Sequence, residues 1–222
     1  MTDSARSAGV VHKVGIAAYG IDDARFVYEP DAVQCSDAEF EALKTVLLGN
    51  AKHHVKVFGN THHPKTGLPY TRPRQEAVYG QDYRYSGITL KQEPESNELV
   101  DRVMRHANGG QDHGPFTWAL VNLYLNGEDN VGMHRDNERE VGGGVVRTYS
   151  FGATRNFVFR ERPTKERGKR KRGAPKPMRA VFALAHGSCG IMEGSAAQTK
   201  WEHGVPVQKR VTMPRISITP RR

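Results

Sequence analysis

The second half of the chain is a series of short segments rich in β-branched and aromatic residues, separated by turn residues. The longest of them, TWALVNLYL from Thr117 to Leu125, is nearly continuous in apolar and β-favouring residues, which is typical of a strand buried on both faces. It is followed by VVRTYSFG, RNFVFR, RAVFALAHG, CGIM and RISITPR. Seven or eight short strands in succession favour two packed sheets, because each sheet must bury its apolar face against another layer.

Two helices are predicted before these strands. Ser36 and Glu39 form a capping box, after which Phe40, Leu43 and Leu47 recur at helical spacing up to Gly49-Asn50. A second helix covers about Asn97 to Ala107 and ends at Asn108-Gly109-Gly110. Its predicted buried stripe comprises Leu99, Val100, Val103, Met104 and Ala107. The pattern predicts an α+β fold in one domain, residues 1–222, whose jelly-roll (double-stranded β-helix) core carries the N-terminal helices on one sheet.

The remaining N-terminal sequence is less regular. The first twenty residues show no sustained period and are expected to be flexible, whereas Phe26-Val27-Tyr28 is expected to open a strand. Residues 54–59 alternate like a strand, and residues 60–73 are expected to form a loop. His62 and His63 in that loop are not expected to bind a metal, because adjacent side chains on an irregular backbone point in different directions. Residues 83–90 are expected to form a short strand or turn with Tyr83 and Tyr85 on one face.

Composition restricts the class of protein. Hydrophobic residues make up 37% and charged residues 26% of the 222 positions, which is typical of a soluble globular protein. No apolar run reaches the length of about 18 residues that a membrane span needs, and the N-terminus lacks the apolar core of a signal peptide. The two cysteines, Cys35 and Cys189, support neither a disulfide framework nor a thiolate zinc site. We therefore expect a protein that is not bound to membranes and stays inside the cell. It is also expected to be a monomer.

Positive charge is concentrated in one segment. Residues 161–179 contain nine of the 33 Lys and Arg residues and two of the 24 Asp and Glu residues, a net charge of +7 out of a total of +9. A charge this local favours an anionic partner, most simply a phosphate backbone. The alternatives are a solvated loop and a nuclear-import signal.

The segment NLYLNGEDNVGMHRD places His134 and Asp136 two residues apart behind a predicted strand on which Asn122 and Tyr124 share a face. The pair alone is weak, since ten His and ten Asp residues give about 0.5 such pairs by chance. A third ligand from WEHGVPV, His203, would complete a facial triad of two histidines and one carboxylate, as in non-haem iron enzymes. His186 and His113 compete for this third place.

The C-terminal segment RISITPR would place Arg215, Ser217, Thr219 and Arg221 on one face of a strand. Two arginines that face a barrel interior must meet anions, and the two carboxylates of 2-oxoglutarate would supply them. Because such a strand is about 20 Å long, either the two side chains converge or only one of them makes the main salt bridge. The alternative is a strand whose arginines face solvent.

These motifs, in this order, resemble the AlkB family of Fe(II)/2-oxoglutarate dioxygenases, and most of all the animal branch that repairs alkylated bases in duplex DNA. The similarity extends from about Phe26 to Arg222 and includes VKVFG, AVYG, YRYSGITL, SFGATRNFVFR and HRDNERE. It implies oxidative demethylation of bases such as 1-methyladenine and 3-methylcytosine, with iron(II), 2-oxoglutarate and dioxygen. It also implies a nuclear location in a eukaryote and a cytoplasmic one otherwise.

The resemblance assigns residues to each part of the site. Iron would be held by His134, Asp136 and His203, and 2-oxoglutarate by Asn122, Tyr124, Arg215, Thr219 and Arg221. Residues 54–90 would recognise the nucleotide. There, Phe58 would be the finger that fills the base stack when the damaged base is flipped out, and Gly59 and Asn60 would lie beside the DNA. The flipped base would enter a pocket lined by Tyr83, Arg84, Tyr85 and Asn137. The basic insert, 161–179, would grip the DNA backbone through Lys169, Arg170, Lys171 and Arg172.

Three residues depart from the family pattern. Asn137 stands where many members have an acidic residue, Arg84 is bulkier and more charged than its usual counterpart, and Ser217 replaces a frequent Asn. The first departure puts the preference for cationic bases in question, and Arg84 is suited to a phosphate contact instead. Two other functions stay open: demethylation of RNA by the same chemistry, and a nucleic-acid-binding module without catalytic activity.

Overall fold

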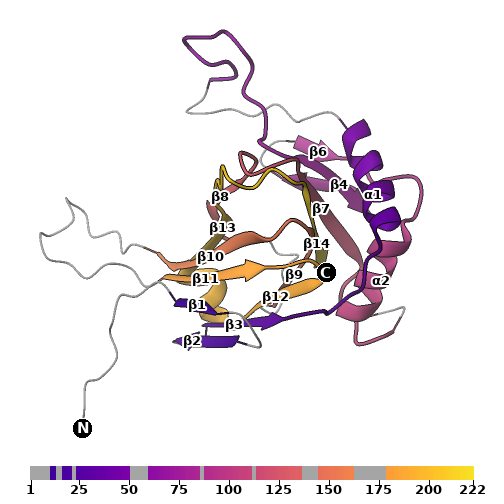
Figure 1. Cartoon of the computed structure of the whole chain (residues 1–222), viewed down its shortest axis with the longest axis vertical. Helices are drawn as coiled ribbons and strands as arrows, with labels where there is room; N and C mark the ends of the chain where they lie inside the picture. Colours follow the sequence, from indigo (N-terminus) through magenta and orange to yellow (C-terminus); the bar gives the residue numbers. More distant parts are fainter. Residues whose placement is uncertain are drawn as a thin grey trace, which may run out of the picture.

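The computed structural model describes residues 11–13, 17–21, 24–50, 60–85, 88–111, 114–136, 145–162 and 179–222. Its strands form a flattened barrel with two helices outside one wall (Figure 1). Within the described ranges, no helix combines the length and apolar character that crossing a membrane would require.

Eight strands of the C-terminal half are divided equally between two sheets. They are β7 (Trp118–Tyr124), β8 (Val131–His134), β9 (Val146–Gly152), β10 (Arg155–Glu161), β11 (Arg179–Leu184), β12 (Ser188–Glu193), β13 (Trp201–Val205) and β14 (Arg215–Arg221). One sheet contains the order β12-β9-β14-β7 and the other the order β11-β10-β13-β8. This arrangement is a double-stranded β-helix, and it confirms the predicted jelly-roll core.

Shorter strands extend both sheets. The first sheet reaches seven strands by adding β4 (Gln75–Tyr79) at one edge and β3 (Ala24–Glu29) with β2 (Ala17–Ile21) at the other. The second sheet reaches five strands by adding β1 (Val11–Lys13), which runs parallel to β11. The strand predicted at Phe26-Val27-Tyr28 is confirmed. The first twenty residues were expected to be flexible. In the structure, β1 pairs with the distant β11, and β2 pairs with β3, which follows it directly in the sequence.

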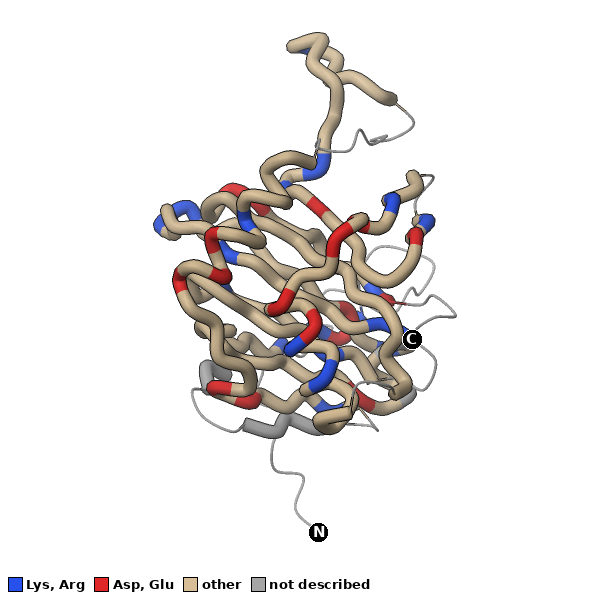
Figure 2. The backbone as a smooth tube through the Cα atoms, turned by 90° about the vertical axis from the view of Figure 1, so that its right-hand side faces the viewer, with Lys and Arg blue, Asp and Glu red and all other residues tan. Residues whose placement is uncertain are grey.

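Two helices cover the outer face of the seven-stranded sheet, as predicted (Figure 1). Helix α1 (Asp37–Gly49) begins at the predicted capping box, in which the Ser36 and Glu39 side chains each bond the other residue's backbone N–H. Helix α2 (Glu98–Ala107) is capped by Asn97. Both bury their predicted apolar stripes, except that Met104 is only half-buried. A third, short helix, α3 (Ser195–Thr199), precedes β13. Acidic and basic residues are interspersed on the face that carries α1 and α2 (Figure 2).

A separate hairpin lies beside β4 and β7. It consists of β5 (Tyr83–Tyr85) and β6 (Ile88–Leu90), and it confirms the strand-and-turn prediction for this segment. Tyr83 and Leu90 pack on Val78, Trp118 and Leu120. The preceding residues, 60–73, are irregular as predicted and project from the barrel (Figures 1 and 2). Residues 54–59 and most of the basic insert, 163–178, lie outside the described residues.

Besides the small cluster beneath the hairpin, two larger apolar clusters fill the molecule. One packs α1 and α2 against the outer face of the seven-stranded sheet, and the other fills part of the space between the sheets around Phe26, Phe157, Phe159 and Phe182. Polar residues of β14 and β7 occupy another part of the inner face. The barrel therefore has an apolar part that holds the sheets together and a polar part that is available for a site.

Candidate active site

Two histidines and one aspartate meet at the edge of the five-stranded sheet. His134, the last residue of β8, lies directly opposite His203 of β13, and Asp136 follows β8 by two residues. The Nε2 atoms of His134 and His203 each lie 3.5 Å from an oxygen of Asp136, and one ligand atom from each of the three residues lies within 4.8 Å of the others. The three residues can therefore hold one metal ion on one side and leave its other side open.

The local packing explains why His203 is fixed in place. Its ring stacks on Phe157 with a centroid distance of 5.4 Å, and the residue is 5% exposed. The next residue is Gly204, where a Cβ atom would lie 2.8 Å from the carbonyl oxygen of Val131. Glycine at this position lets β13 approach β8 closely, which brings the two histidine rings to a centroid distance of 4.2 Å.

The surroundings of Asp136 and His203 keep these two residues in their metal-binding protonation states. Burial opposes the ionisation of Asp136, but Arg221 and the two histidines outweigh it and hold the pKa of this carboxyl well below its usual range. Burial lowers the pKa of His203 to about 3, although Asp136 acts in the opposite direction. At neutral pH, the site presents a carboxylate and a neutral imidazole, the forms that bind metals.

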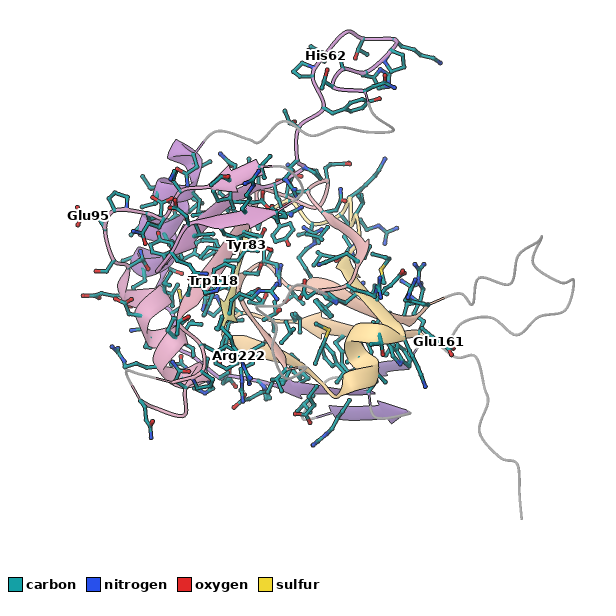
Figure 3. All side chains as sticks on the ribbon, turned by 180° about the vertical axis from the view of Figure 1, so that it is seen from behind. His62, Tyr83, Glu95, Trp118, Glu161 and Arg222 are labelled. Atoms are coloured by element: carbon teal, nitrogen blue, oxygen red, sulfur yellow. The ribbon has the colours of Figure 1, made fainter. Side chains whose placement is uncertain are left out.

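The other histidines considered from the sequence lie elsewhere or outside the described residues. His186 has its ring nitrogens 3.1 Å from the backbone N–H of Gly152 and 3.0 Å from the carbonyl oxygen of Cys35, so it ties β9 to the start of α1. His62 lies on the projecting segment, away from the barrel (Figure 3). His113 lies outside the described residues. Of the described candidates, His203 is the one that joins His134 and Asp136.

The polar face of β14 is buried rather than exposed to solvent. Arg215, Ser217, Thr219 and Arg221 are between 1% and 7% exposed, which excludes the solvent-facing alternative. Pairing with β7 places Tyr124 opposite Arg215 and Asn122 opposite Ser217. The five residues predicted to hold 2-oxoglutarate therefore line one polar surface between the sheets: Asn122, Tyr124, Arg215, Thr219 and Arg221.

The two arginines of β14 have different surroundings. Arg221 lies beside the three-residue cluster, with its guanidinium 3.1 Å from Asp136 Oδ2. Arg215, one strand length away, donates from Nε to Ser150 Oγ at 2.8 Å and lies over the ring of Tyr124. Its two terminal nitrogens have no hydrogen-bond partner among the described residues, and burial lowers its pKa. A buried guanidinium without an anion is costly, so Arg215 fits a carboxylate that enters from outside.

One cavity connects these parts. It has a volume of about 460 Å³ and is lined by the two histidines and Asp136, by the polar residues of β14 and β7, and by Tyr83 and Tyr85 of the hairpin. This volume is within the range of sites for small ligands. A cosubstrate bound at Arg215 and a planar group beside the tyrosines would therefore share one space with a metal ion.

The chain matches the family described as the 2OG-Fe(II) oxygenase superfamily over residues 31–221. It belongs to this superfamily. Membership implies iron(II), 2-oxoglutarate and dioxygen, as the sequence predicted.

Individual relatives indicate the family within this superfamily. The chain is 36% identical over 171 residues to the DNA oxidative demethylase ALKBH2 of Homo sapiens, and the aligned region covers 74% of this chain and 59% of the relative. It is 34% identical over 154 residues to the alpha-ketoglutarate-dependent dioxygenase alkB homolog 3 of Homo sapiens, which covers 68% of this chain and 52% of the relative. The oxygenase thus spans between half and two thirds of the length of these relatives, and the predicted membership of the AlkB family is confirmed.

A solved structure supports the fold. The structure of OsALKBH1 matches with a TM-score of 0.51 at 16% identity, over 93% of this chain and 100% of that chain. At this identity the similarity concerns the arrangement of strands and helices alone.

Four of the predicted nucleotide-binding residues are among the described residues, and they differ in exposure. Tyr83 and Tyr85 line the cavity, whereas Arg84 and Asn60 are exposed. The others lie outside the described residues: Phe58, Gly59, Asn137, Lys169, Arg170, Lys171 and Arg172.

A buried charged network beside the tyrosines was missed in the sequence. Glu76 of β4 accepts hydrogen bonds on Oε1 from Arg74 at 2.6 Å and from the hydroxyl of Tyr85 at 2.5 Å. Arg74 also donates from Nε to Oδ1 of Asn122 at 2.8 Å, which links the hairpin to the cosubstrate region. The signal was RPRQEAVYG, where two arginines and a carboxylate come directly before an apolar strand end.

Proposed function

We propose that this oxygenase oxidatively demethylates N-alkylated bases, such as 1-methyladenine and 3-methylcytosine, in DNA, and that it prefers duplex DNA. The observation that carries the proposal is the shared cavity, in which a candidate metal site, an unmatched buried guanidinium and two aromatic rings open into one space. Relatives named as a DNA oxidative demethylase and an alpha-ketoglutarate-dependent dioxygenase support the same reaction.

In this proposal, His134, Asp136 and His203 hold iron(II). Arg215 binds the distal carboxylate of 2-oxoglutarate, with Asn122, Tyr124, Thr219 and Arg221 around the cosubstrate. When bound, these groups supply an oxidation in which one oxygen atom of dioxygen hydroxylates the N-methyl carbon and the other converts 2-oxoglutarate to succinate and CO₂, after which the hydroxymethyl group leaves as formaldehyde.

The residues of the chain provide orientation and charge. Arg221 holds Asp136 in its ionised form and fixes the direction of the carboxylate. Phe157 holds the ring of His203 in the plane that lets Nε2 face Asp136. The sheets on both sides exclude water from Arg215, which strengthens its attraction for a carboxylate.

The DNA contacts belong to the same proposal. Residues 54–90 form the nucleotide-recognition region, where Phe58 fills the gap left by the flipped base and Gly59 and Asn60 lie along the strand. Tyr83, Arg84, Tyr85 and Asn137 surround the flipped base. Four residues of the basic insert grip the backbone: Lys169, Arg170, Lys171 and Arg172. The protein acts as a monomeric single domain, in the nucleus of a eukaryotic cell or the cytoplasm of a prokaryotic one.

The test is formaldehyde release from oligonucleotides that contain 1-methyladenine. Purified protein with iron(II), 2-oxoglutarate and oxygen is given the lesion in duplex DNA, single-stranded DNA and RNA of the same sequence. We expect the highest rate with duplex DNA and no product with H134A. A preference for RNA would redirect the proposal to an RNA demethylase, and the absence of product from all three substrates would overturn it.

An independent measurement separates an inactive binding module from an enzyme that lacks its substrate. Anaerobic protein with iron(II) and 2-oxoglutarate is expected to show a weak visible charge-transfer band that neither component gives alone. H134A is expected to lack the band. If the wild-type protein also lacked it, the oxygenase site would be incomplete.

A further inference from the structure

The ring of Tyr85 is covered on both faces. Tyr83 stacks on it with a centroid distance of 4.7 Å and an interplanar angle of 15°. The guanidinium carbon of Arg72 lies 4.3 Å from the centroid of the same ring. A planar ring has two faces, and these two contacts use both. Arg72 therefore covers the Tyr85 face on which a base would stack.

Arg72 also lies beside Oε2 of Glu76, the carboxylate oxygen that accepts no hydrogen bond from the described residues. The carboxylate uses Oε1 for Arg74 and the Tyr85 hydroxyl, whereas Oε2 has no hydrogen-bond partner among the described residues. Oε2 lies 3.4 Å from Nε of Arg72, which is an ion-pair distance without a hydrogen bond. The Glu76 side chain is 0% exposed, so this acceptor is shielded from bulk water.

Arg72 is the more easily released of the two arginines beside Glu76. Arg74 donates two hydrogen bonds, one to Glu76 and one to Asn122. The Nε of Arg72 has no hydrogen-bond partner among the described residues, and the side chain is 13% exposed. Arg72 is also part of the irregular segment that leads into β4. When Arg72 leaves, Glu76 keeps its pair with Arg74, so the departure does not leave a bare charge.

The chemistry of Arg72 indicates what can replace it. Its guanidinium is planar, positively charged and rich in N–H donors, and it meets an aromatic face and a carboxylate oxygen. N1-methyladenine and N3-methylcytosine share these properties, because each is a planar cation with an exocyclic amino group. A methylated thymine has no exocyclic amino group and no charge, so it offers the ring face alone.

We propose that the Tyr85 face and Glu76 Oε2 form the recognition site for the exocyclic amino edge of a flipped adenine or cytosine, and that Arg72 occupies this site until the base displaces it. The inference rests on the proposed function, since it concerns the same cavity. Glu76 then sets the base preference of the enzyme and Arg72 lowers its affinity for any flipped base, although neither residue was identified from the sequence. The Tyr85 hydroxyl donates a hydrogen bond to Glu76, which fixes the position of the ring relative to the carboxylate.

The test is binding rather than turnover. Protein loaded with Mn(II) and 2-oxoglutarate is titrated against short single-stranded oligonucleotides that carry 1-methyladenine or 3-methylthymine, and fluorescence anisotropy gives the Kd. R72A is expected to bind both lesions about fivefold more tightly, because the base no longer competes with a cation–π contact. E76Q is expected to weaken binding of 1-methyladenine about tenfold and to change that of 3-methylthymine little, because one acceptor of a charged hydrogen bond is lost.

The controls are R25A and E193Q, which break a surface ion pair of 2.9 Å on β3 and β12. The sign of the R72A result is decisive, since the removal of an arginine that merely contacts phosphate weakens binding. Weaker binding by R72A, or the same affinity as R25A, would overturn the proposal. The proposal would also be overturned if the ratio of the two Kd values, for 1-methyladenine and 3-methylthymine, were the same in E76Q as in the wild type. If E76Q does not fold, the comparison of R72A with R25A decides alone.

Formaldehyde release distinguishes this inference from the function on which it rests. A wild-type protein that shows the predicted binding pattern without product would contradict the demethylase function and leave the recognition site in place. An active protein in which R72A does not bind more tightly would contradict the recognition site alone.

Discussion

The two faces of β14 are buried to a similar degree, but their side chains have different partners. On the outer face, Ile216 and Ile218 are 0% exposed and pack in the cluster beneath α1 and α2. On the inner face, Arg215 is 1% exposed, yet two of its nitrogens have no partner among the described residues. The protein completes the contacts of the outer face by itself, whereas on the inner face it leaves the terminal nitrogens of Arg215 without a partner among the described residues. Substitutions on the two faces should therefore change different measured quantities.

The largest effect is expected at the candidate metal site on and after β8, which Arg221 of the inner face contacts through Asp136. His134 is 41% exposed in its side chain, and its Nδ1 lies 2.9 Å from the carbonyl oxygen of Gly132, so little packing is lost in H134A. Activity should fall by more than about a hundredfold, since the loss of even an outer-shell partner of a metal ligand costs 10–100-fold. Thermal unfolding without metal should change little. A large drop in the unfolding temperature would mean that His134 mainly supports the fold.

On the outer face, I216A should act on stability alone. Removal of a fully buried isoleucine side chain is expected to cost about 2–5 kcal/mol in the free energy of unfolding, because a cavity remains between the sheet and the helices. Urea unfolding gives this value, and the KM for 2-oxoglutarate should stay within about twofold of wild type. A large rise in KM with little loss of stability would remove the distinction between the faces.

R215M tests the inner face directly. The KM for 2-oxoglutarate should rise by about ten- to a hundredfold, which corresponds to the loss of about 1.5–3 kcal/mol from a charged hydrogen bond. Stability should be unchanged or higher, because the substitution removes a buried charge without an anion.

The matched control for R215M is R155M. Arg155 is also 1% exposed, but it donates to Gln208 Oε1 and to the carbonyl oxygens of Asn126, Asp129 and Pro206. Its removal takes a buried donor from the three carbonyl oxygens, while Gln208 Oε1 keeps the backbone N–H of Asn156, so stability should fall while the KM changes less. Equal losses of stability in the two variants would show that Arg215 is also a structural residue.

The smallest effect concerns the N-terminal cap of α1. This helix covers the outer face of the sheet that contains β14. The backbone N–H of Ser36, together with Arg102 and the Ser36 hydroxyl, lowers the pKa of Glu39 from 4.5 to about 2. Because the folded pKa is the lower one, Glu39 stabilises the fold above about pH 4.5, and this contribution is lost as the pH falls toward 2. The difference in unfolding free energy between wild type and E39Q should shrink over this range, while E41Q serves as the control. A constant difference would contradict the assignment.

The sequence predicted those elements whose signals are local. The capping box at Ser36, the apolar stripes of both helices and the β-favouring segments after Thr117 each form a pattern within a few residues. The spacing of His134 and Asp136 likewise depends on one strand end. His203 could be chosen over His186 only because its segment leads into the arginine strand, and the structure agrees because β13 pairs with β8.

Other features depend on contacts between distant segments. Gln75 and Glu76 lie on the buried strand β4. No local pattern shows that Arg74, Tyr85 and Arg72 surround the Glu76 carboxylate. The difference between Arg215 and Arg221 also arises from tertiary structure, because the sequence shows two equivalent positions on one strand face. Strand β1 forms because the edge strand β11, far away in the sequence, offers it hydrogen bonds.

Among the described residues, β8 is the last strand of its sheet and pairs with β13 alone. Because two of the three candidate ligands lie on or just after this outermost strand, a metal ion can reach them from the side without any separation of the two sheets. The metal should therefore exchange with the folded protein: a chelator would withdraw it and leave the barrel intact, and its return would restore activity without refolding. This behaviour differs from that of structural zinc sites, where removal of the ion unfolds the domain.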